Sequence, residues 1–460
     1  MQIIKNTVYI ILISIFTILP AIAEEVIEQQ ISQKHKDKCF TETGKIKVCV
    51  GHPNSSETNF IIDYPKKTIR AKSSLNFKIS EQTNKVFFFF EPVVKKAFLN
   101  KSEVKTERRK TPGNEDWIIV IPVQPNLKEY NLELEYDITK LTKWGHSWKP
   151  FWWLTDYSDS SDARFSNVFT PASFEAERYP MTYTFEFKGL KDELNLYTSA
   201  SVTHKIGKNY YVLKFADWNN LAGPYFEFTS LKYQSHSFIY KGKYKPVPVT
   251  LYFDPSLGKP KGIKNNTIIK KTENIIRNTL KKFESTFGQY AFDKLLVKLY
   301  SLQEGDLPLK LEYSMEFGGA VVSRLELIPH ELCHQWFGRG ASPVDGQAGF
   351  VDELVCDWYD YNNPVKPPKV EKPTLLSSKN SFTLRTPEES YREGKFFREM
   401  AYVYKQHNLD IYTFLKEFYQ KFRLSGYSKD DFVKQLETGY PGDLKPYFKR
   451  YIDGIDDKND

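Results

Sequence analysis

Two histidines and a glutamate between residues 324 and 361 of this 460-residue chain stand at spacings that a zinc ion can use. His330 and His334 are four residues apart, so on a helix their rings share one face and can bind one metal. Glu331 would be turned about 100° from His330, where its carboxylate can reach a metal-bound water. Eighteen residues lie between His334 and Glu353, which can supply a third ligand. Three protein ligands leave a fourth position open to water, as in catalytic zinc sites.

These ligands require two helices that meet at the metal, one carrying the histidines and one beginning near Glu353. The segment between them is rich in glycine, which is typical of a turn. Before the histidines, apolar residues recur at helical spacing over 265–288 and the pattern ends at Gly288. We expect strands over 293–302 and 314–317, and mostly helices after the second metal-binding helix.

The first half of the chain has a different pattern. From about residue 45 to 250, runs rich in aromatic and β-branched residues, such as KVFFFFEPVV and MTYTFEFKG, alternate with turn residues. This pattern predicts a mostly antiparallel β domain, and 460 residues exceed what one hydrophobic core usually serves. We therefore predict an α+β, multidomain fold, with a β-rich N-terminal domain over 24–245 and the metal-binding domain over 246–460.

Residues 1–23 have the features of a secretory signal peptide. Lys5 precedes an apolar run over 7–20, and small residues follow at 21–23 as at a cleavage site. We expect an exported protein, periplasmic or secreted, without stable membrane insertion after cleavage; an uncleaved anchor is the alternative. The net charge of +8 is spread along the chain, which disfavours nucleic acid as a partner.

The chain contains four cysteines. Cys39 and Cys49 flank the hairpin-like sequence FTETGKIKV, and we expect them to pair in an exported protein. Cys333 lies inside the histidine motif without being needed as a ligand. Cys356 lies on the facing helix, so these two form either a second disulfide or two buried thiols.

Taken together, these motifs resemble those of the aminopeptidase N family of zinc metallopeptidases, the gluzincins. HELCHQWFG is followed by the glutamate of FVDEL at the family's spacing. YSMEFGGAVV resembles the family's Gly-x-Met-Glu-Asn exopeptidase motif, which assigns Glu316 to substrate binding. SYREGKFFREM resembles the segment with the family's catalytic tyrosine, which assigns that role to Tyr391.

The resemblance implies a mostly helical, thermolysin-like catalytic domain over 246–460 and one zinc ion per chain. It implies removal of N-terminal residues from peptides, with Glu331 as general base and Tyr391 stabilising the oxyanion. Glu316 would pair with the substrate's α-amine, so we expect peptides with a free N-terminus as partners. The resemblance ends with the catalytic domain, so we expect a short, bacterial-type member without the helical C-terminal domain of larger members.

Metal-binding histidines usually donate their other N–H to a carboxylate. Asp357 and Asp360 lie four and seven residues after Glu353, on the same helix face, and the family's pattern favours Asp360. Three positions depart from the family's motifs without removing a ligand, and they leave substrate preference open: Ser314, Arg339 and Leu354.

Two alternatives use the same residues. One is a zinc endopeptidase or another hydrolase, and the other is a non-catalytic binding protein that kept the fold. The intact pair of Glu331 and Tyr391 argues against the second. A cluster of aromatic residues either packs between domains or forms a wall beside the substrate's first side chain: Trp144, Trp148, Phe151, Trp152 and Trp153.

Overall fold

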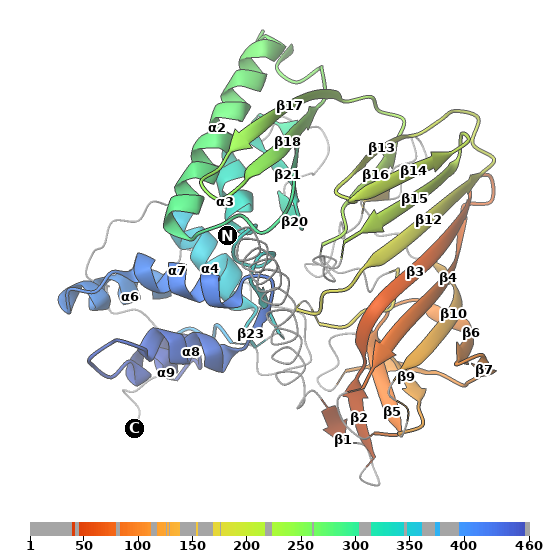
Figure 1. Ribbon diagram of the computed structural model, residues 1–460, viewed down its shortest axis with the longest axis horizontal. Coiled ribbons are helices and arrows are strands. Elements are labelled where there is room, and N and C mark those ends of the chain that lie inside the picture. The colour runs from red at the N-terminus through yellow and green to blue at the C-terminus, as the bar shows by residue number, and fades with distance from the viewer. Residues whose placement is uncertain are drawn as a thin grey trace, which may run out of the picture.

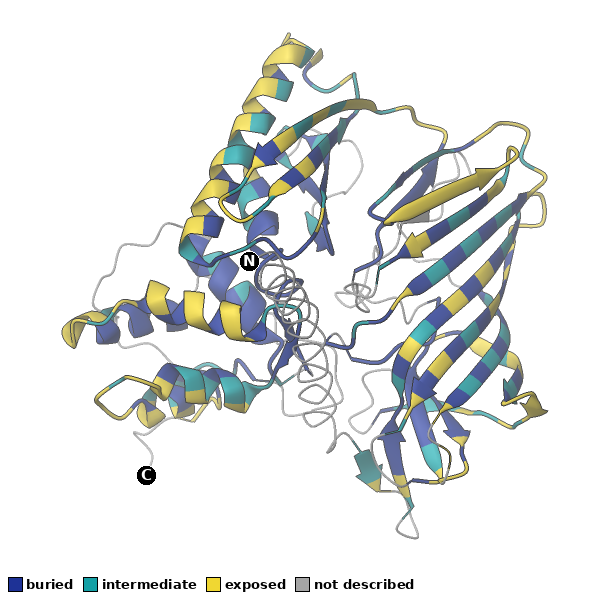
Figure 2. Ribbon diagram, viewed as in Figure 1, coloured by how far each residue is buried: buried dark blue, intermediate teal, exposed yellow. Residues whose placement is uncertain are grey.

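Strands with one buried face build the N-terminal part of the molecule. Every second side chain of β10 (Tyr130–Ile138) is buried, and β12 (Met181–Lys188) has the same alternation. The alternation runs along the strands of the large sheet in Figure 2. Because successive side chains of a strand point to opposite faces, each strand packs one face on the core.

The computed structural model describes residues 39–41, 46–79, 83–111, 117–125, 127, 129–138, 153–154, 169–174, 176–216, 223–259, 262–302, 314–344, 347–360, 373–377 and 395–455. Of residues 153, 154 and 360 it describes the backbone only. The predicted signal peptide over 1–23 lies outside the described residues.

Within the described residues, the N-terminal part contains three sheets (Figure 1). The largest has the order β14 (Val202–Ile206), β15 (Tyr210–Phe215), β12, β3 (His52–Asp63), β4 (Thr68–Lys78), β10, β6 (Val93–Leu99) and β7 (Ser102–Glu103). The second has the order β1 (Cys39–Thr41), β2 (Lys47–Val50), β5 (Lys85–Phe89), β9 (Trp117–Pro122) and β8 (Glu107–Lys110). The third contains β11 (Trp153–Leu154), β16 (Phe226–Thr229) and β13 (Asn195–Thr198). Neighbouring strands are antiparallel except β12 with β3 and β2 with β5, which confirms the predicted, mostly antiparallel β domain.

A mixed sheet and helices form the C-terminal part. The sheet has the order β17 (Gln234–Lys241), β18 (Pro246–Phe253), β19 (Leu295–Ser301), β21 (Ala320–Arg324) and β20 (Met315–Phe317). The helices are α2 (Asn265–Thr286), η3 (Leu325–Leu327), α3 (Ile328–Cys333), α4 (Phe350–Asp360), α6 (Lys395–Gln406), α7 (Ile411–Phe422), α8 (Lys429–Glu437) and α9 (Lys445–Tyr451). Two short strands, β22 (Ser342–Pro343) and β23 (Gly426–Tyr427), pair with each other. Among the helices of the described residues, none combines the length and hydrophobicity needed to span a bilayer.

The structure agrees with the expected order of helices and strands, but the helix of the histidines is shorter than expected. The helix predicted over 265–288 is α2, and Gly288 follows it with a φ of +118°, which favours glycine. The predicted strands are β19 and β20. Helix α3 is shorter than expected, because it ends at Cys333 and His334 caps it.

The domain limits remain a prediction, but one strand pairing bears on them. β17 pairs with β18 along its full length, so this hairpin crosses the boundary predicted between 245 and 246. Both strands belong to the sheet of the C-terminal part. We therefore propose to move the boundary to the segment between Thr229, the end of β16, and Gln234.

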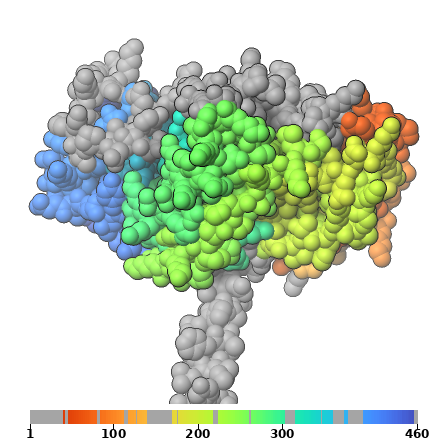
Figure 3. Space-filling model, turned by 90° about the horizontal axis from the view of Figure 1, so that it is seen from above, coloured from red at the N-terminus to blue at the C-terminus, as the bar shows by residue number. Residues whose placement is uncertain are grey.

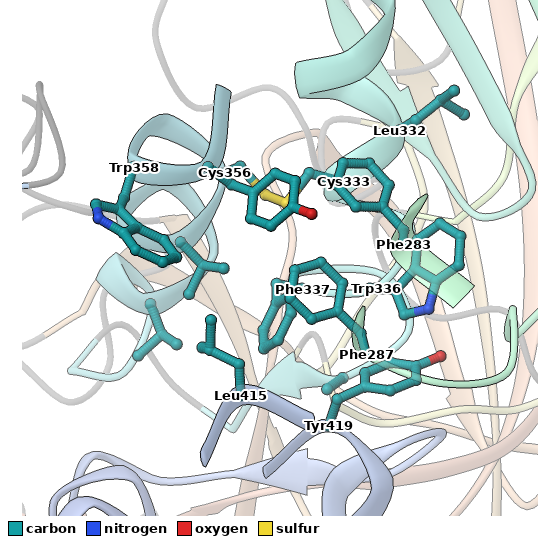
Figure 4. Packing of buried hydrophobic residues seen from close by; sticks show 14 of the residues in the cluster. Phe283, Phe287, Leu332, Cys333, Trp336, Phe337, Cys356, Trp358, Leu415 and Tyr419 are labelled. Carbon is teal, nitrogen blue, oxygen red and sulfur yellow. A yellow bond between two sulfur atoms is a disulfide. The ribbon is translucent and has the colours of Figure 1, made fainter. Parts of the chain in front are cut away.

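Aromatic side chains pack against helices α3 and α4 in the core of the C-terminal part (Figure 4). Trp336 is fully buried and its indole donates a hydrogen bond to the Gly288 carbonyl, 3.0 Å away. Its ring lies 5.4 Å from that of Phe283 in α2. A disulfide between Cys333 and Cys356 joins α3 to α4 in the same core, so the pairing that the sequence left open is present. Cys39 and Cys49 form the predicted disulfide across β1 and β2.

Candidate metal centre

Helices α3 and α4 bring the three predicted ligands to one place. His330 lies in α3, and His334 follows it with φ −61° and ψ −18°, which continue the helical turn. Glu353 lies in the first turn of α4. His330 Nε2 is 3.2 Å from His334 Nε2, and each of these nitrogens is 3.4 Å from Glu353 Oε2.

The triangle formed by these three atoms has the size that tetrahedral zinc requires. Zinc binds imidazole nitrogen and carboxylate oxygen at about 2.0–2.1 Å, so two ligands of a tetrahedral ion lie about 3.3–3.4 Å apart. The three observed separations of 3.2, 3.4 and 3.4 Å match this distance between two ligands of a tetrahedral zinc ion. The donor set therefore fits a zinc ion without rearrangement.

The remaining ring nitrogens indicate which atoms would face the metal. His334 Nδ1 lies 3.3 Å from the Phe337 carbonyl oxygen, which can only accept a hydrogen bond. His330 Nδ1 lies 3.6 Å from Asp357 Oδ1. If both Nδ1 atoms carry the protons, both Nε2 lone pairs point at each other and at Glu353. Such an arrangement is repulsive unless a cation lies between them.

The charges of the site also favour a cation. Burial lowers the pKa of His330, but the Glu353 carboxylate outweighs this effect and raises the pKa to about 9. Burial likewise lowers the pKa of His334, and the carboxylates of Glu316 and Glu353 raise it above its usual value. The carboxylates thus stabilise positive charge at the imidazoles, and a divalent ion can take the place of protons there.

Glu331 lies beside this triangle without belonging to it. Burial raises the pKa of its carboxyl to about 8, and the nearby Glu316 carboxylate adds to the shift while His330 opposes it. Carboxylate or imidazole atoms of Glu316, Glu331 and His334 lie within 4.8 Å of one another. A carboxyl group with its pKa near neutrality can both accept and return a proton.

Glu316 reaches the site from the neighbouring hairpin, β20–β21. Gln335 holds this hairpin against the end of α3, because its amide nitrogen donates to the Phe317 carbonyl at 2.8 Å. Its amide oxygen accepts from the Gly319 backbone N–H at 3.0 Å. Arg339 then contacts the carboxylate directly, with Nη2 2.7 Å from Glu316 Oε1.

Sequence reasoning missed the roles of Gln335 and Arg339. The only signal that the sequence offers is their place, with Gln335 inside HELCHQWFG and Arg339 directly after it. The structure shows that both side chains are buried. Gly338 belongs to the glycine-rich segment that was predicted as a turn. It has a φ of +109°, and a Cβ atom added at this position would lie 3.1 Å from Asp352 Oδ2. Helix α4 therefore packs closely on this turn.

Some of the predicted residues cannot be compared with the structure. Asp357 approaches His330, whereas the side chain of Asp360, the family's favoured position, lies outside the described residues. Tyr391 also lies outside them, four residues before α6 begins at Lys395. The same holds for the side chains of the aromatic cluster over 144–153.

No protein-family model matches this sequence, and no curated protein matches it in a sequence search. The fold, however, is similar to solved structures. An M1 zinc metallopeptidase from Deinococcus radiodurans matches with a TM-score of 0.61 and 14% identity, over 90% of this chain and 96% of that one. Native yeast LTA4 hydrolase matches with a TM-score of 0.59 and 12% identity, over 88% of this chain and 68% of that one.

A third structure, Legionella pneumophila aminopeptidase A, matches with a TM-score of 0.65 and 10% identity over 90% of this chain. The match covers 51% of the Legionella chain, so this chain spans about half its length. The protein therefore has the fold of M1 zinc metallopeptidases, a β-rich domain followed by a thermolysin-like domain. The fold implied by the aminopeptidase N resemblance is thereby confirmed.

Proposed function

We propose that the protein is a zinc-dependent aminopeptidase. The observation that carries the proposal is the triangle of His330, His334 and Glu353 ligand atoms with Glu331 beside it. Related structures support a peptide substrate. A mutant of a two-domain M1 zinc metallopeptidase has been crystallised with L-arginine and with L-tryptophan. A mutant of the Deinococcus enzyme has been crystallised with a Tyr-Ser-Ala substrate, and the Legionella enzyme with aspartic acid.

His330, His334 and Glu353 would hold one zinc ion per chain. When bound, zinc polarises the scissile carbonyl and acidifies a water molecule. Glu331 takes the proton of the attacking water on its carboxylate and delivers it to the leaving amine. Tyr391 donates a hydrogen bond from its phenol to the oxyanion.

Glu316 supplies the reason to favour an exopeptidase over an endopeptidase. Its carboxylate lies beside Glu331 and His334, at the edge of the proposed metal site. An α-ammonium group exists only at the first residue of a peptide, so a carboxylate here favours free N-termini. The endopeptidase alternative has no comparable observation in its support.

The protein would act outside the cytoplasm. Both disulfides fit an oxidising compartment, which supports export through the predicted signal peptide. The choice between periplasm and secretion stays a prediction.

A panel of fluorogenic aminoacyl substrates, measured with and without a chelator, tests the proposed function. We expect turnover that is lost on chelation and returns when zinc is added back. Each substrate is paired with its N-acetylated form, which a true aminopeptidase leaves intact. Zinc-loaded protein that turns over none of the free substrates would contradict the proposal.

A further inference from the structure

Arg339 and Glu316 form an ion pair inside the protein, next to the proposed metal site. The Nη2–Oε1 distance is 2.7 Å, and the exposed fractions of the two side chains are 0% and 4%. Arg339 is among the largest fully buried side chains of the described residues. A charged hydrogen bond of this kind is short, directional and largely unscreened by solvent.

The backbone of Arg339 is itself fixed by the N-terminal part of the chain. Arg178 Nη2 donates to the Arg339 carbonyl at 2.7 Å and lies 3.3 Å from the Gly340 carbonyl. The neighbouring residue, Glu177, contacts His52 of β3 with 2.5 Å between Oε1 and Nδ1. The N-terminal part therefore holds the backbone of Arg339, while the Arg339 side chain contacts Glu316 in the C-terminal part.

The Glu316 carboxylate is consequently held from two sides. Gln335 fixes the hairpin that carries it through the Phe317 and Ala320 carbonyls. Arg339 fixes the carboxylate itself. A carboxylate that must meet an amine in one orientation binds it best when its own rotamer is locked by such contacts.

We infer that Arg339 is a positioning residue that determines specificity, because it fixes the Glu316 carboxylate for binding the α-amine of the substrate. This inference rests on the proposed aminopeptidase function. Arg339 is buried and acts through Glu316, so it sets the preference for free N-termini without touching the substrate.

Arg339 could instead act mainly by compensating the negative charge of Glu316. A guanidinium this close to Glu316 reduces the net negative charge that an α-ammonium meets. If that effect dominated, removing Arg339 would increase the preference for free N-termini. The fixed position and the burial of the pair favour the positioning role, so we expect the preference to decrease.

The test compares one peptide in its free and N-acetylated forms, with kcat and KM measured separately for each variant. In Arg339→Met the ratio of kcat/KM for free over acetylated peptide should fall about tenfold or more, mainly through KM. Arg339→Lys keeps a cation without the planar guanidinium and should give an intermediate ratio. Zinc content and thermal unfolding are measured for every variant. If Arg339→Met does not fold, Arg339→Lys alone still tests the inference.

Two controls separate positioning from general damage. Arg277→Met removes an arginine that pairs with Glu273 on α2 and should leave the ratio unchanged. In a Glu316→Gln background, Arg339→Met should cause no further drop in the ratio, because its effect passes through the carboxylate.

An unchanged or higher ratio in Arg339→Met, or an equal drop in the Glu316→Gln background, would overturn the role of Arg339. A wild-type protein that cleaves both forms equally, or neither, would instead contradict the proposed aminopeptidase function. The two failures are therefore distinguishable.

Discussion

At the scale of residues, three carboxylates share one small site and differ in their counter-charges. Glu353 faces two imidazoles, which hold its pKa well below the usual value although burial raises it. Glu316 faces the Arg339 guanidinium. Burial instead raises the pKa of Glu331 to about 8. These differences support the proposed roles, in which Glu353 binds the metal, Glu316 recognises the substrate and Glu331 transfers the proton.

Replacing Glu331 by glutamine tests its assignment as the base. The amide cannot accept the proton, while the ligand triangle is untouched, so kcat should fall by roughly 10²–10⁴ with zinc content unchanged. Elemental analysis and steady-state kinetics measure the two quantities. A variant with wild-type kcat would contradict the assignment.

Tyr391→Phe tests the proposed oxyanion donor. Loss of one donor should lower kcat by roughly 10²–10³ without loss of zinc. Tyr402→Phe, a tyrosine of α6 eleven residues later in the chain, is the matched control and should behave like the wild type. If the two variants have the same kcat, the role belongs to another residue.

At the scale of elements, the helices and strands could be predicted from local sequence patterns. The contacts between residues far apart in the chain could not. The spacing of His330, His334 and Glu353 depends on helical geometry, so it could be interpreted from the sequence. The contact of Arg339 with Glu316 joins a turn to a strand 23 residues earlier, and no periodicity indicates it. The early end of α3 at Cys333 is likewise set by the tight turn that follows.

The Cys333–Cys356 disulfide joins the helix of His330 to the helix of Glu353. Replacing both cysteines by alanine should lower the free energy of unfolding by about 3 kcal/mol, because the cross-link closes a loop of this length. Zinc affinity should fall as well, since the two ligand helices are then less fixed relative to each other. Thermal unfolding and chelator competition measure both effects.

The double variant of Cys39 and Cys49 is the control for this experiment. That disulfide joins β1 to β2, away from the proposed metal centre, so its loss should leave zinc affinity unchanged. Equal zinc affinity in wild type and in the Cys333/Cys356 variant would contradict a role for the disulfide in holding the ligands together.

At the scale of the whole molecule, the N-terminal part and the C-terminal part meet through both apolar and charged contacts. Viewed from above, the two parts lie on opposite sides of the molecule (Figure 3). An apolar cluster includes Tyr225 and Phe317, whose rings are 4.9 Å apart. The order of β and helical regions was predictable from composition. Their interface was not, because its residues come from distant segments with no shared pattern.

A buried ion pair crosses this interface between β16 and β19. Lys298 Nζ lies 2.6 Å from Glu227 Oε2, and the hydroxyls of Tyr225 and Tyr233 each donate to the same carboxylate at 3.0 Å. Lys298→Met leaves a buried carboxylate without its cation and should destabilise the protein by about 3–5 kcal/mol. Denaturant unfolding measures this loss.

The double variant Lys298→Met with Glu227→Gln serves as the control. It removes both charges and should recover most of the stability, because no buried charge is left uncompensated. A Lys298→Met variant as stable as the wild type would show that the ion pair does not contribute to joining the two parts.

The central claim, a zinc aminopeptidase built on His330, His334 and Glu353, is tested most directly by following one unlabelled peptide over time by mass spectrometry. With zinc-loaded protein we expect products that shorten one residue at a time from the N-terminus, and no products after chelation or with Glu331→Gln. Internal fragments, or an intact peptide in the presence of zinc-loaded protein, would contradict the account.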